Sequence, residues 1–315
     1  MHKSRSFLLI HGLVLSALLA MQGCSTTSHL VAPVSAGQPS SSGAMERLID
    51  QPGPIEIETI DSADWRVPLS GLLNLNSEAA KAAHLTDRDE PIQVFAHVIR
   101  HPQRGIYLVD TGVSHVVVEQ PDSVGLNWMI RKSLPVEKMK IKRSAADIVG
   151  SLHGKLAGVF FTHLHIDHIA GMPELPNDVQ LFIGPSESSE RGLLHMFTQS
   201  PTNALLQGKP PFHEWNFQPD PDHQFQAVTD VFGDGTIFAI SVPGHTSGST
   251  AYLVRTPKGP VLLTGDACHT RWGWEHGVEP GTYTDDQPRN LQNLIRLKAL
   301  VARHPGIDVR LGHQY

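Results

Sequence analysis

The chain has 315 residues, of which 40% are hydrophobic and 18% are charged, and its formal net charge is −6 with histidine neutral. This length can bury one large core, and the acidic balance argues against a nucleic-acid partner, which would require a basic surface. The two cysteines, Cys24 and Cys268, are too few for a disulfide framework or a four-cysteine metal site. The 19 histidines are an excess, and neutral imidazole is a common ligand for metal ions.

The first 24 residues predict a targeting segment. Lys3 and Arg5 precede a mostly apolar stretch from Phe7 to Met21, which is short for a membrane-spanning helix, since such a helix needs about 20 residues. The sequence Met-Gln-Gly-Cys that ends at Cys24 resembles the lipobox of bacterial lipoproteins, although methionine and glutamine replace the usual leucine and small residue. We therefore expect residues 1–24 to be a lipoprotein-type signal peptide; an ordinary secretory signal and a retained anchor are the alternatives.

All three interpretations export the protein, so we expect a periplasmic or outer-membrane-anchored lipoprotein of a bacterium that touches the membrane only through lipid on Cys24. Residues 25–51 are rich in Ser, Thr, Pro and Gly and show little apolar periodicity. This composition predicts a flexible tether. The folded domain should then comprise residues 52–315.

The first half of this domain predicts strands. Apolar residues alternate with charged ones from Ile55, and two further strands, 92–99 and 106–109, flank a turn and predict a hairpin. The hairpin ends in Asp110-Thr-Gly, which fits either an active-site loop or a simple turn cap. Residues 121–143 combine Trp128 and Met129 with several lysines and arginines. That pattern suits a membrane surface, an acidic substrate or merely a solvated helix face.

The densest motif follows an apolar run, 159–161, that predicts a short buried strand. It places His163, His165, Asp167 and His168 within six positions. In extended backbone, residues two apart point the same way, so His163 and His165 can reach one metal ion together. Asp167 and His168 are adjacent and must point toward a second place. The alternative is a histidine-rich surface loop.

The second half repeats the pattern of a strand followed by a small residue and then His or Asp. A long proline-rich region, 185–232, comes first, and it predicts either a lid or substrate wall, or a loop packed on itself. Strands then end at His245, Asp266 and His313, with an amphipathic helix around Leu294 to Val301. Because four separate strand ends deliver such side chains, we expect them to share one site.

These strand ends supply five histidines and two aspartates. Zinc takes nitrogen from histidine and oxygen from carboxylate, usually with four ligands, so two zinc ions that share one carboxylate would use the whole set. Manganese, iron and cobalt tolerate the same ligands. Cys268 lies beside this set, and we expect it to be a buried structural thiol.

Taken together, the motifs resemble the metallo-β-lactamase superfamily of metal-dependent hydrolases, over essentially all of residues 52–315. The matching strings are Leu-Val-Asp-Thr-Gly at 108–112, Thr-His-Leu-His-Ile-Asp-His at 162–168, Pro-Gly-His-Thr at 243–246, Gly-Asp at 265–266 and Gly-His at 312–313. The resemblance implies an α+β fold, a four-layer αβ/βα sandwich with two mixed sheets packed face to face and helices outside.

The resemblance also implies a role for each residue. His163, His165 and His245 would hold the first of two zinc ions per chain. Asp167, His168 and His313 would hold the second, Asp266 would bridge them, and Asp110 would orient ligands without binding metal. Hydroxide between the ions would attack a carbonyl or phosphoryl centre, with Asp167 handling the proton.

The substrate follows less directly from the motifs. The dominant true β-lactamases of this superfamily have arginine at the position of His168 and cysteine at that of Asp266. The chain is closer to the N-acyl-homoserine lactonase-like group, which shares the ligand set. Those enzymes carry a tyrosine three residues after the bridging aspartate, where this chain has His269. His269 is either the proton donor in its place, which makes it a second catalytic candidate, or an ordinary loop residue.

We therefore expect a dinuclear zinc hydrolase that acts on a lactone or similar ester of a small molecule. An organophosphate or phosphodiester hydrolase of the same fold is one alternative. A metal-binding lipoprotein without catalysis is an alternative of another class. The sequence leaves the oligomeric state open.

Overall fold

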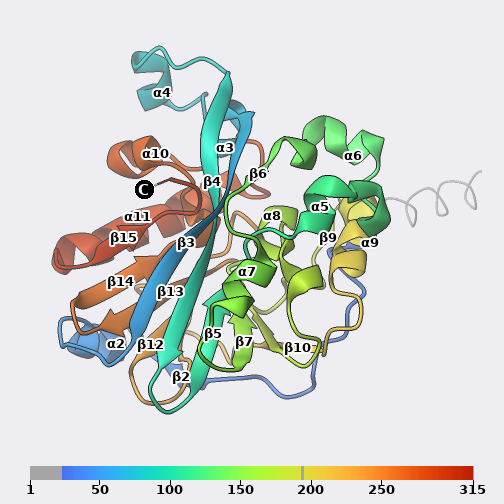
Figure 1. The fold of residues 1–315 in the computed structure, drawn as a ribbon. Coiled ribbons are helices and arrows are strands. Elements are labelled where there is room, and N and C mark those ends of the chain that lie inside the picture. The colour runs from blue at the N-terminus through green and yellow to red at the C-terminus, as the bar shows by residue number, and fades with distance from the viewer. Residues whose placement is uncertain (1–22, 193–194, 315) are drawn as a thin grey trace, which may run out of the picture.

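A computed structural model of the protein describes residues 23–192 and 195–314. Two mixed β-sheets pack face to face, and helices cover their outer faces (Figure 1). Within the described residues, the first sheet has the strand order β10-β8-β7-β5-β4-β3-β6 and the second has the order β15-β14-β13-β12-β11-β2. The four layers confirm the expected αβ/βα sandwich of the α+β class.

The first sheet is antiparallel around the predicted hairpin and parallel beyond it. Its strands are β3 (Glu56–Pro68), β4 (Asp89–His101), β5 (Gly105–Val109), β6 (Lys140–Ile141), β7 (Leu156–Phe160), β8 (Gln180–Ile183) and β10 (Phe212–Glu214). The hairpin of β4 and β5 is confirmed, and β7 is the short buried strand expected before the histidine motif.

The second sheet is antiparallel except where β14 and β15 run parallel. Its strands are β2 (Gln38–Ser40), β11 (Val228–Asp230), β12 (Ile237–Ser241), β13 (Thr250–Thr256), β14 (Gly259–Leu263) and β15 (Asp308–Arg310). Two further short strands, β1 (Cys24–Ser25) and β9 (Arg191–Gly192), pair with each other.

Helices pack on the outer face of each sheet. On the first sheet and around its rim lie α3 (Leu69–Leu72), α4 (Glu78–Ala82), α5 (His115–Glu119), α6 (Trp128–Ser133), α7 (Ala145–Gly150), α8 (Ile166–Ile169) and α9 (His195–Leu205), with the 3₁₀ turns η1 (Pro121–Val124), η2 (Val136–Lys138) and η3 (Met172–Glu174). On the second lie α2 (Ser42–Ile49), α10 (Arg271–His276) and α11 (Gln287–Arg303), with η4 (Gly265–Ala267) at the end of β14. Among the described residues, no helix has the length and apolar character needed to cross a membrane.

The layer between the sheets is rich in aromatic side chains. Phe160 of β7 packs on Tyr107 and Tyr252, with ring centroids 4.8 Å and 5.9 Å away. Trp215 donates a hydrogen bond of 3.0 Å to the Tyr252 hydroxyl, which itself donates to the carbonyl of Phe161 at 2.8 Å. Each such buried ring contributes roughly 1.5–3 kcal/mol of apolar burial. These contacts join the end of β7 in the first sheet to β13 in the second sheet.

The prediction of a flexible tether over residues 25–51 is wrong, because this segment is folded onto the domain. Strand β2 pairs with β11, and α2 buries Met45 and Ile49 completely against the second sheet. Ser42 donates to Asp220 at 2.7 Å. The folded body therefore begins near Cys24 and not near residue 52, because a Ser- and Gly-rich segment with two apolar anchors finds its partners in distant parts of the chain. The predicted signal peptide lies outside the described residues, except for Gly23 and Cys24.

The region 185–232 contains more regular structure than its prolines predicted. It includes α9, β10 and β11. Phe212 and Trp215 are buried in the body, whereas Met196 and Phe197 are exposed on α9. The two interpretations of this region thus apply to different side chains, because some pack into the core and others remain at the surface.

Candidate metal centre

The loops after β7, β12, β14 and β15 meet at one edge of the sandwich. They carry all seven predicted metal ligands. The structure gathers these side chains into two groups whose potential ligand atoms lie within 4.8 Å of one another in each, namely His163, His165, His245 and Asp266 in one and Asp167, His168 and His313 in the other.

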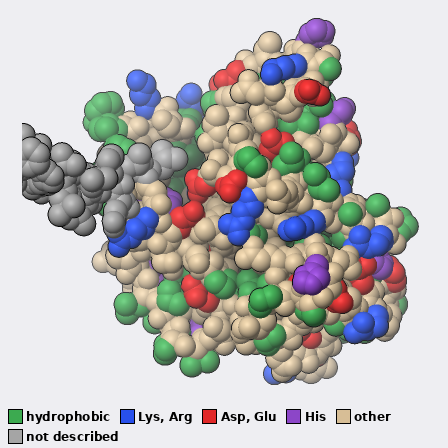
Figure 2. Space-filling view, turned by 180° about the vertical axis from the view of Figure 1, so that it is seen from behind, with side chains coloured by type: hydrophobic (Ala, Val, Ile, Leu, Met, Phe, Trp, Pro, Cys, Tyr) green, Lys and Arg blue, Asp and Glu red, His purple; other side chains and the backbone are tan. Residues whose placement is uncertain are grey.

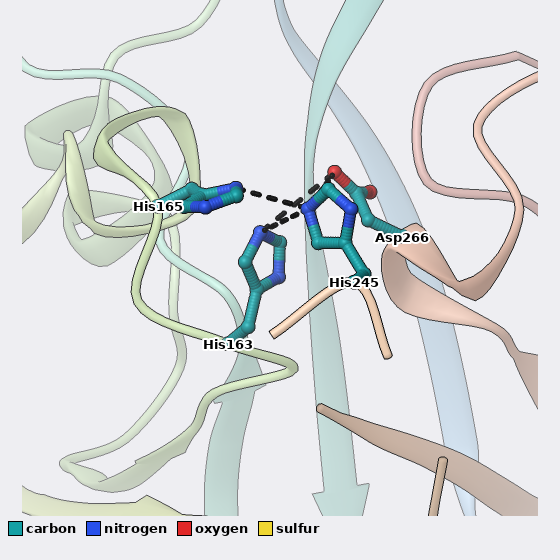
Figure 3. A group of neighbouring side chains, drawn as sticks. All are labelled: His163, His165, His245 and Asp266. Carbon is teal, nitrogen blue, oxygen red and sulfur yellow. Dashed lines mark hydrogen bonds and ion pairs between the residues drawn. The ribbon is translucent and has the colours of Figure 1, made fainter. Parts of the chain in front are cut away.

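In the first group, three imidazole rings and one carboxylate point toward a common place from three separate loops (Figure 3). The Nε2 atom of His245 lies 2.9 Å from Nδ1 of His165 and 3.2 Å from Nε2 of His163. The Oδ2 atom of Asp266 lies 3.4 Å from Nε2 of His245 and 3.7 Å from Nε2 of His163. This arrangement presents nitrogen and oxygen donors of the kind that zinc prefers.

Burial sets the protonation of these rings. It lowers the pKa of His165 to about 4 and holds the pKa values of His163 and His245 well below the usual range, with the neighbouring imidazoles adding to the effect for both. Neutral imidazole has a free lone pair, which is the form that binds metal ions. The first group therefore suits a cation at neutral pH.

In the second group, the Nε2 atoms of His313 and His168 lie 3.4 Å and 3.8 Å from Oδ2 of Asp167. The Oδ2 atom of Asp266 is 3.3 Å from Nε2 of His313 and 3.4 Å from Nε2 of His168. One oxygen atom of Asp266 therefore faces both groups at once, which is the placement that a bridging carboxylate requires.

One buried atom supports this fit. Nε2 of His168 is buried without any hydrogen-bond partner among the described residues and lies 3.4 Å from Oδ2 of Asp266. A buried polar atom left in this state costs about 1–3 kcal/mol, so such atoms are rare in folded proteins. A cation held between His168 and Oδ2 of Asp266 would give this nitrogen a partner, and the residues present therefore fit a metal centre.

Hydrogen bonds on the far side of each ring orient these ligands. Nδ1 of His168 donates to Asp110 at 2.8 Å, and Nδ1 of His313 donates to the carbonyl of Gln93 at 2.8 Å. Nδ1 of His245 contacts the Thr284 hydroxyl at 3.0 Å. With Nδ1 engaged, Nε2 of each ring is left to face the site. Asp110 thus lies where an orienting residue is expected, with its carboxylate on Thr162 and the His168 ring.

Glu187 was not singled out by the sequence, yet it connects the loops of the first group. Its carboxylate accepts hydrogen bonds from the backbone of Leu164 at 2.7 Å, the hydroxyl of Thr246 at 2.7 Å and the backbone of Gly248 at 2.9 Å. Leu164 lies between two of the histidines, and Thr246 follows the third. Burial raises the pKa of Glu187 to about 7. A lone glutamate in a serine-rich turn gives no sequence signal for this role.

His269 also reaches the centre. Its Nδ1 donates to the carbonyl of Leu72 at 2.9 Å, and its Nε2 lies 2.9 Å from Oδ2 of Asp266. Both ring nitrogens are thus engaged within the protein, which favours a role in holding Asp266; its role as a proton donor stays a prediction. Cys268 is buried, as expected, and burial raises the pKa of its thiol to about 12.

A cavity of about 480 Å³ lies over the two groups. His165, Asp167, Asp266, His269 and His313 form its polar base. Its walls are largely apolar and come from β3, β4, α3, α6 and α9, with Trp65, Val67, Leu72, Ile92, Leu134 and Phe197 among them. A cavity of this size with a few convergent polar groups is typical of a small-molecule site.

Comparison with known proteins agrees with the geometry. The sequence model of the metallo-beta-lactamase superfamily matches residues 89–302. The N-acyl homoserine lactonase AttM of Rhizobium johnstonii is 27% identical over 252 residues, which cover 78% of this chain and 90% of the relative. The AttM protein of Agrobacterium fabrum is 33% identical over 136 residues, or 42% of this chain and 50% of the relative.

Solved structures show the same fold. A quorum-quenching N-acyl homoserine lactone lactonase superimposes with a TM-score of 0.59 at 17% identity and covers 84% of this chain and 94% of its own. AidC, a dizinc quorum-quenching lactonase, superimposes with a TM-score of 0.53 at 14% identity, covering 89% and 92%. Since the superfamily model spans well over half of the sequence, the protein belongs to the metallo-β-lactamase superfamily.

Proposed function

We propose that this protein is a dinuclear zinc hydrolase that opens a lactone, or cleaves a similar ester, of a small molecule with an apolar tail. The position of Asp266 carries the proposal, because one of its oxygens faces both groups of ligands at the base of the cavity. In the proposed centre His163, His165 and His245 would hold one ion, Asp167, His168 and His313 would hold the other, and Asp266 would serve both.

Zinc bound by such ligands lowers the pKa of water toward about 7 and polarises an ester carbonyl. The protein's own groups do the rest. Asp167, which lines the cavity, would accept and return a proton beside the reacting ester. Asp110 and the Gln93 carbonyl keep the rings of His168 and His313 in the tautomer that faces the site.

The cavity walls support the substrate class. A lactone ring at the polar base would place an acyl tail against the apolar side chains above it, where burial favours hydrocarbon. The names of the relatives, N-acyl homoserine lactonases, agree with this substrate. We take a lactone with an acyl chain as the substrate class to test first.

The test is a hydrolysis panel with the zinc-loaded full chain. We expect about two zinc ions per chain and the fastest hydrolysis on N-acyl lactones, compared with phosphotriesters and β-lactams. His165→Ala should lower kcat/KM by at least about 100-fold without unfolding the protein, because it removes a ligand. His115→Ala, which removes an exposed histidine on α5, is the control.

Retained activity in His165→Ala would show that the ligand assignment is wrong. Phosphotriesters as the best substrates would point to the organophosphate alternative, and metal binding without hydrolysis would point to the non-catalytic one.

We also propose that the protein is exported and carries lipid on Cys24, on the strength of the apolar stretch and the Met-Gln-Gly-Cys sequence. Labelling of producing cells with an alkyne-tagged fatty acid should mark the wild-type chain but not Cys24→Ser. Cys268→Ser, which alters the buried cysteine, should remain labelled. Equal labelling of wild type and Cys24→Ser would contradict the proposed anchor.

A further inference from the structure

Four large hydrophobic side chains stand in solvent at the mouth of the cavity. On α6, Trp128 is 70% exposed and Met129 is 51% exposed; on α9, Met196 is 55% exposed and Phe197 is 54% exposed. Met129 and Phe197 also line the cavity itself. We call these four residues the apolar rim. Soluble proteins rarely leave such a group uncovered beside a binding site, and such groups mark contact surfaces.

The two helices of the apolar rim are neighbours. Gly125, just before α6, is packed so closely on Pro201 of α9 that an added Cβ would lie 3.3 Å from its backbone. Basic side chains accompany the hydrophobic ones, since Arg131 and Lys132 occupy the last turn of α6. Figure 2, seen from behind, shows hydrophobic and basic side chains protruding together at the corner that α6 forms in Figure 1.

The chain enters the folded body beside the same rim. Cys24 in β1 pairs with Gly192 in β9, three residues before α9 begins. The side-chain amide of Gln199 on α9 donates to the carbonyl and the hydroxyl of Ser25, both at 2.9 Å. Thr26 lines the cavity. Cys24 is therefore held two residues from the cavity wall, and no slack chain separates it from the mouth.

We propose that the apolar rim docks on a phospholipid bilayer, with the mouth of the cavity facing the membrane, so that acyl substrates enter from the lipid phase. The proposal rests on the membrane attachment of the N-terminal segment proposed above. A lipid on Cys24, or a retained apolar stretch from Phe7 to Met21, would hold the rim within a few residues of the bilayer. Tryptophan and phenylalanine with neighbouring lysine and arginine are the side chains that settle at a membrane interface.

The position of Cys24 beside the apolar rim favours a lipid bilayer as the partner that covers the rim. A flexible tether would let the protein turn any face toward the bilayer, but the pairing of β1 with β9 removes that freedom. Leu30 and Val34, on the segment after β1, are exposed as well, but the rim is the exposed hydrophobic surface that lines the cavity, next to the basic turn of α6 that anionic lipid attracts. A second copy of the chain, or the Phe7 to Met21 stretch folded over the rim, are the other occupants that the experiment separates.

The experiment measures contact and not mere binding, because the anchored chain binds vesicles in any case. The full chain is reconstituted in phosphatidylcholine–phosphatidylglycerol vesicles with or without brominated acyl chains, which quench tryptophan fluorescence on contact. Of the five tryptophans, Trp65 and Trp215 are buried and Trp272 and Trp274 are partly buried on α10, so the exposed Trp128 is the one best placed to report. We expect quenching by brominated lipid that Trp128→Ser largely removes and Phe197→Ser weakens. Ile295→Ser is the matched control, since Ile295 is 57% exposed but lies on α11.

A second readout uses turnover. Trp128→Ser should hydrolyse a water-soluble short-chain ester at the wild-type rate, because Trp128 is not among the cavity-lining residues. It should hydrolyse a long-chain ester dissolved in vesicles about threefold more slowly or worse, since the weakened rim no longer holds the mouth of the cavity against the lipid phase from which the substrate enters. If the wild-type protein hydrolyses neither the short-chain nor the long-chain ester, the proposed function is overturned. The quenching result would still test the docking proposal by itself.

Three outcomes overturn the docking proposal itself. The first is equal fluorescence in brominated and plain vesicles while the chain is bound. The second is a dimer in solution that Trp128→Ser dissolves and that keeps Trp128 from the brominated lipid. The third is protection of Trp128 from aqueous iodide in the absence of vesicles, which would mean that the chain's own N-terminal stretch covers the rim.

Discussion

At the scale of single residues, the centre depends on side chains that bind no metal. Asp110 adopts a left-handed backbone conformation with φ of 56°, which non-glycine residues rarely occupy. Its carboxylate accepts hydrogen bonds from the Thr162 backbone at 2.8 Å, the Thr162 hydroxyl at 2.9 Å and the His168 ring at 2.8 Å. These three contacts hold a strained residue in place. Strain of this kind concentrates at functional sites, where the surroundings stabilise it.

Glu187 supports the first ligand group in the same way, and Glu187→Gln tests its role. The side-chain amide offers one acceptor and a donor where the carboxylate offers two acceptors, so it must lose bonds to Leu164, Thr246 or Gly248. We expect the affinity for zinc to fall by about 10–100-fold, as for other residues that orient metal ligands. Competition against a chromophoric chelator measures it.

Glu190→Gln is the matched control, because Glu190 lies in the same turn as Glu187 but accepts its hydrogen bond from Ser247, in the His245 loop alone. Its affinity for zinc should stay close to that of the wild type. An unchanged affinity in Glu187→Gln would mean that the histidine loops keep their places without the buried carboxylate.

At the scale of secondary-structure elements, α2 explains why residues 25–51 are ordered. Its apolar side packs on the second sheet, and its polar side meets the end of α11. Glu46 contacts His304 at 3.0 Å and Arg303 at 2.8 Å, and Asp50 contacts His304 at 2.8 Å. These ion pairs are partly exposed, so together they contribute about 1 kcal/mol or less.

This network predicts a pH dependence of stability. Burial alone would favour neutral His304, but its hydrogen bonds to Glu46 and Asp50 outweigh that effect and raise its pKa above 6.5. Burial likewise opposes the charge on Glu46, yet the bonds from Arg303 and His304 lower its pKa below 4.5. The contribution of His304 is full below pH 6.5 and is lost as the pH rises through its raised pKa. That of Glu46 is full above pH 4.5 and is lost as the pH falls.

His304→Gln should therefore differ most from the wild type between pH 4.5 and 6.5, and the difference should shrink at alkaline pH. Urea midpoints at pH 5.5 and pH 9 measure it. His115→Gln removes an exposed histidine paired within one helix and should show little difference at either pH. A His304→Gln effect that grows with pH would contradict the assigned pairing.

The elements also show what the sequence predicted and what it did not. Alternating apolar residues and strand-end motifs were enough to predict β4, β5, β7 and the ligand loops, because those signals are local. The pairing of β2 with β11 joins residues nearly two hundred positions apart, and the sequence around Pro39 contains no local strand pattern that predicts it. Likewise, Glu187 has a role only through its three hydrogen-bond donors. Partners that lie far away in the chain leave no local pattern to read.

At the scale of the whole molecule, the metal centre spans the interface between the sheets. Asp167 and three histidines follow β7 of the first sheet, whereas His245, Asp266 and His313 follow strands of the second. In the folded protein these side chains stand close together at the seam, where His165 and Asp167 are half-buried and the other five are buried. A cation bound by them would therefore join the two halves of the sandwich directly.

Removal of metal should lower the stability of the whole sandwich and not only of a loop. A ligand present at about 100 times its Kd stabilises the folded state by about 2.7 kcal/mol, and for a protein of this size that corresponds to a change in Tm of roughly 5 °C or more. Calorimetry of the chelator-treated chain should show this decrease, with zinc restoring the Tm. Magnesium should restore little, because it prefers oxygen ligands to imidazole. His165→Ala, which lacks one ligand, should show a smaller response to zinc than the wild type. A Tm that changes with neither chelator nor zinc would mean that the two groups of side chains hold no metal. That result would also contradict the proposed metal-dependent hydrolase.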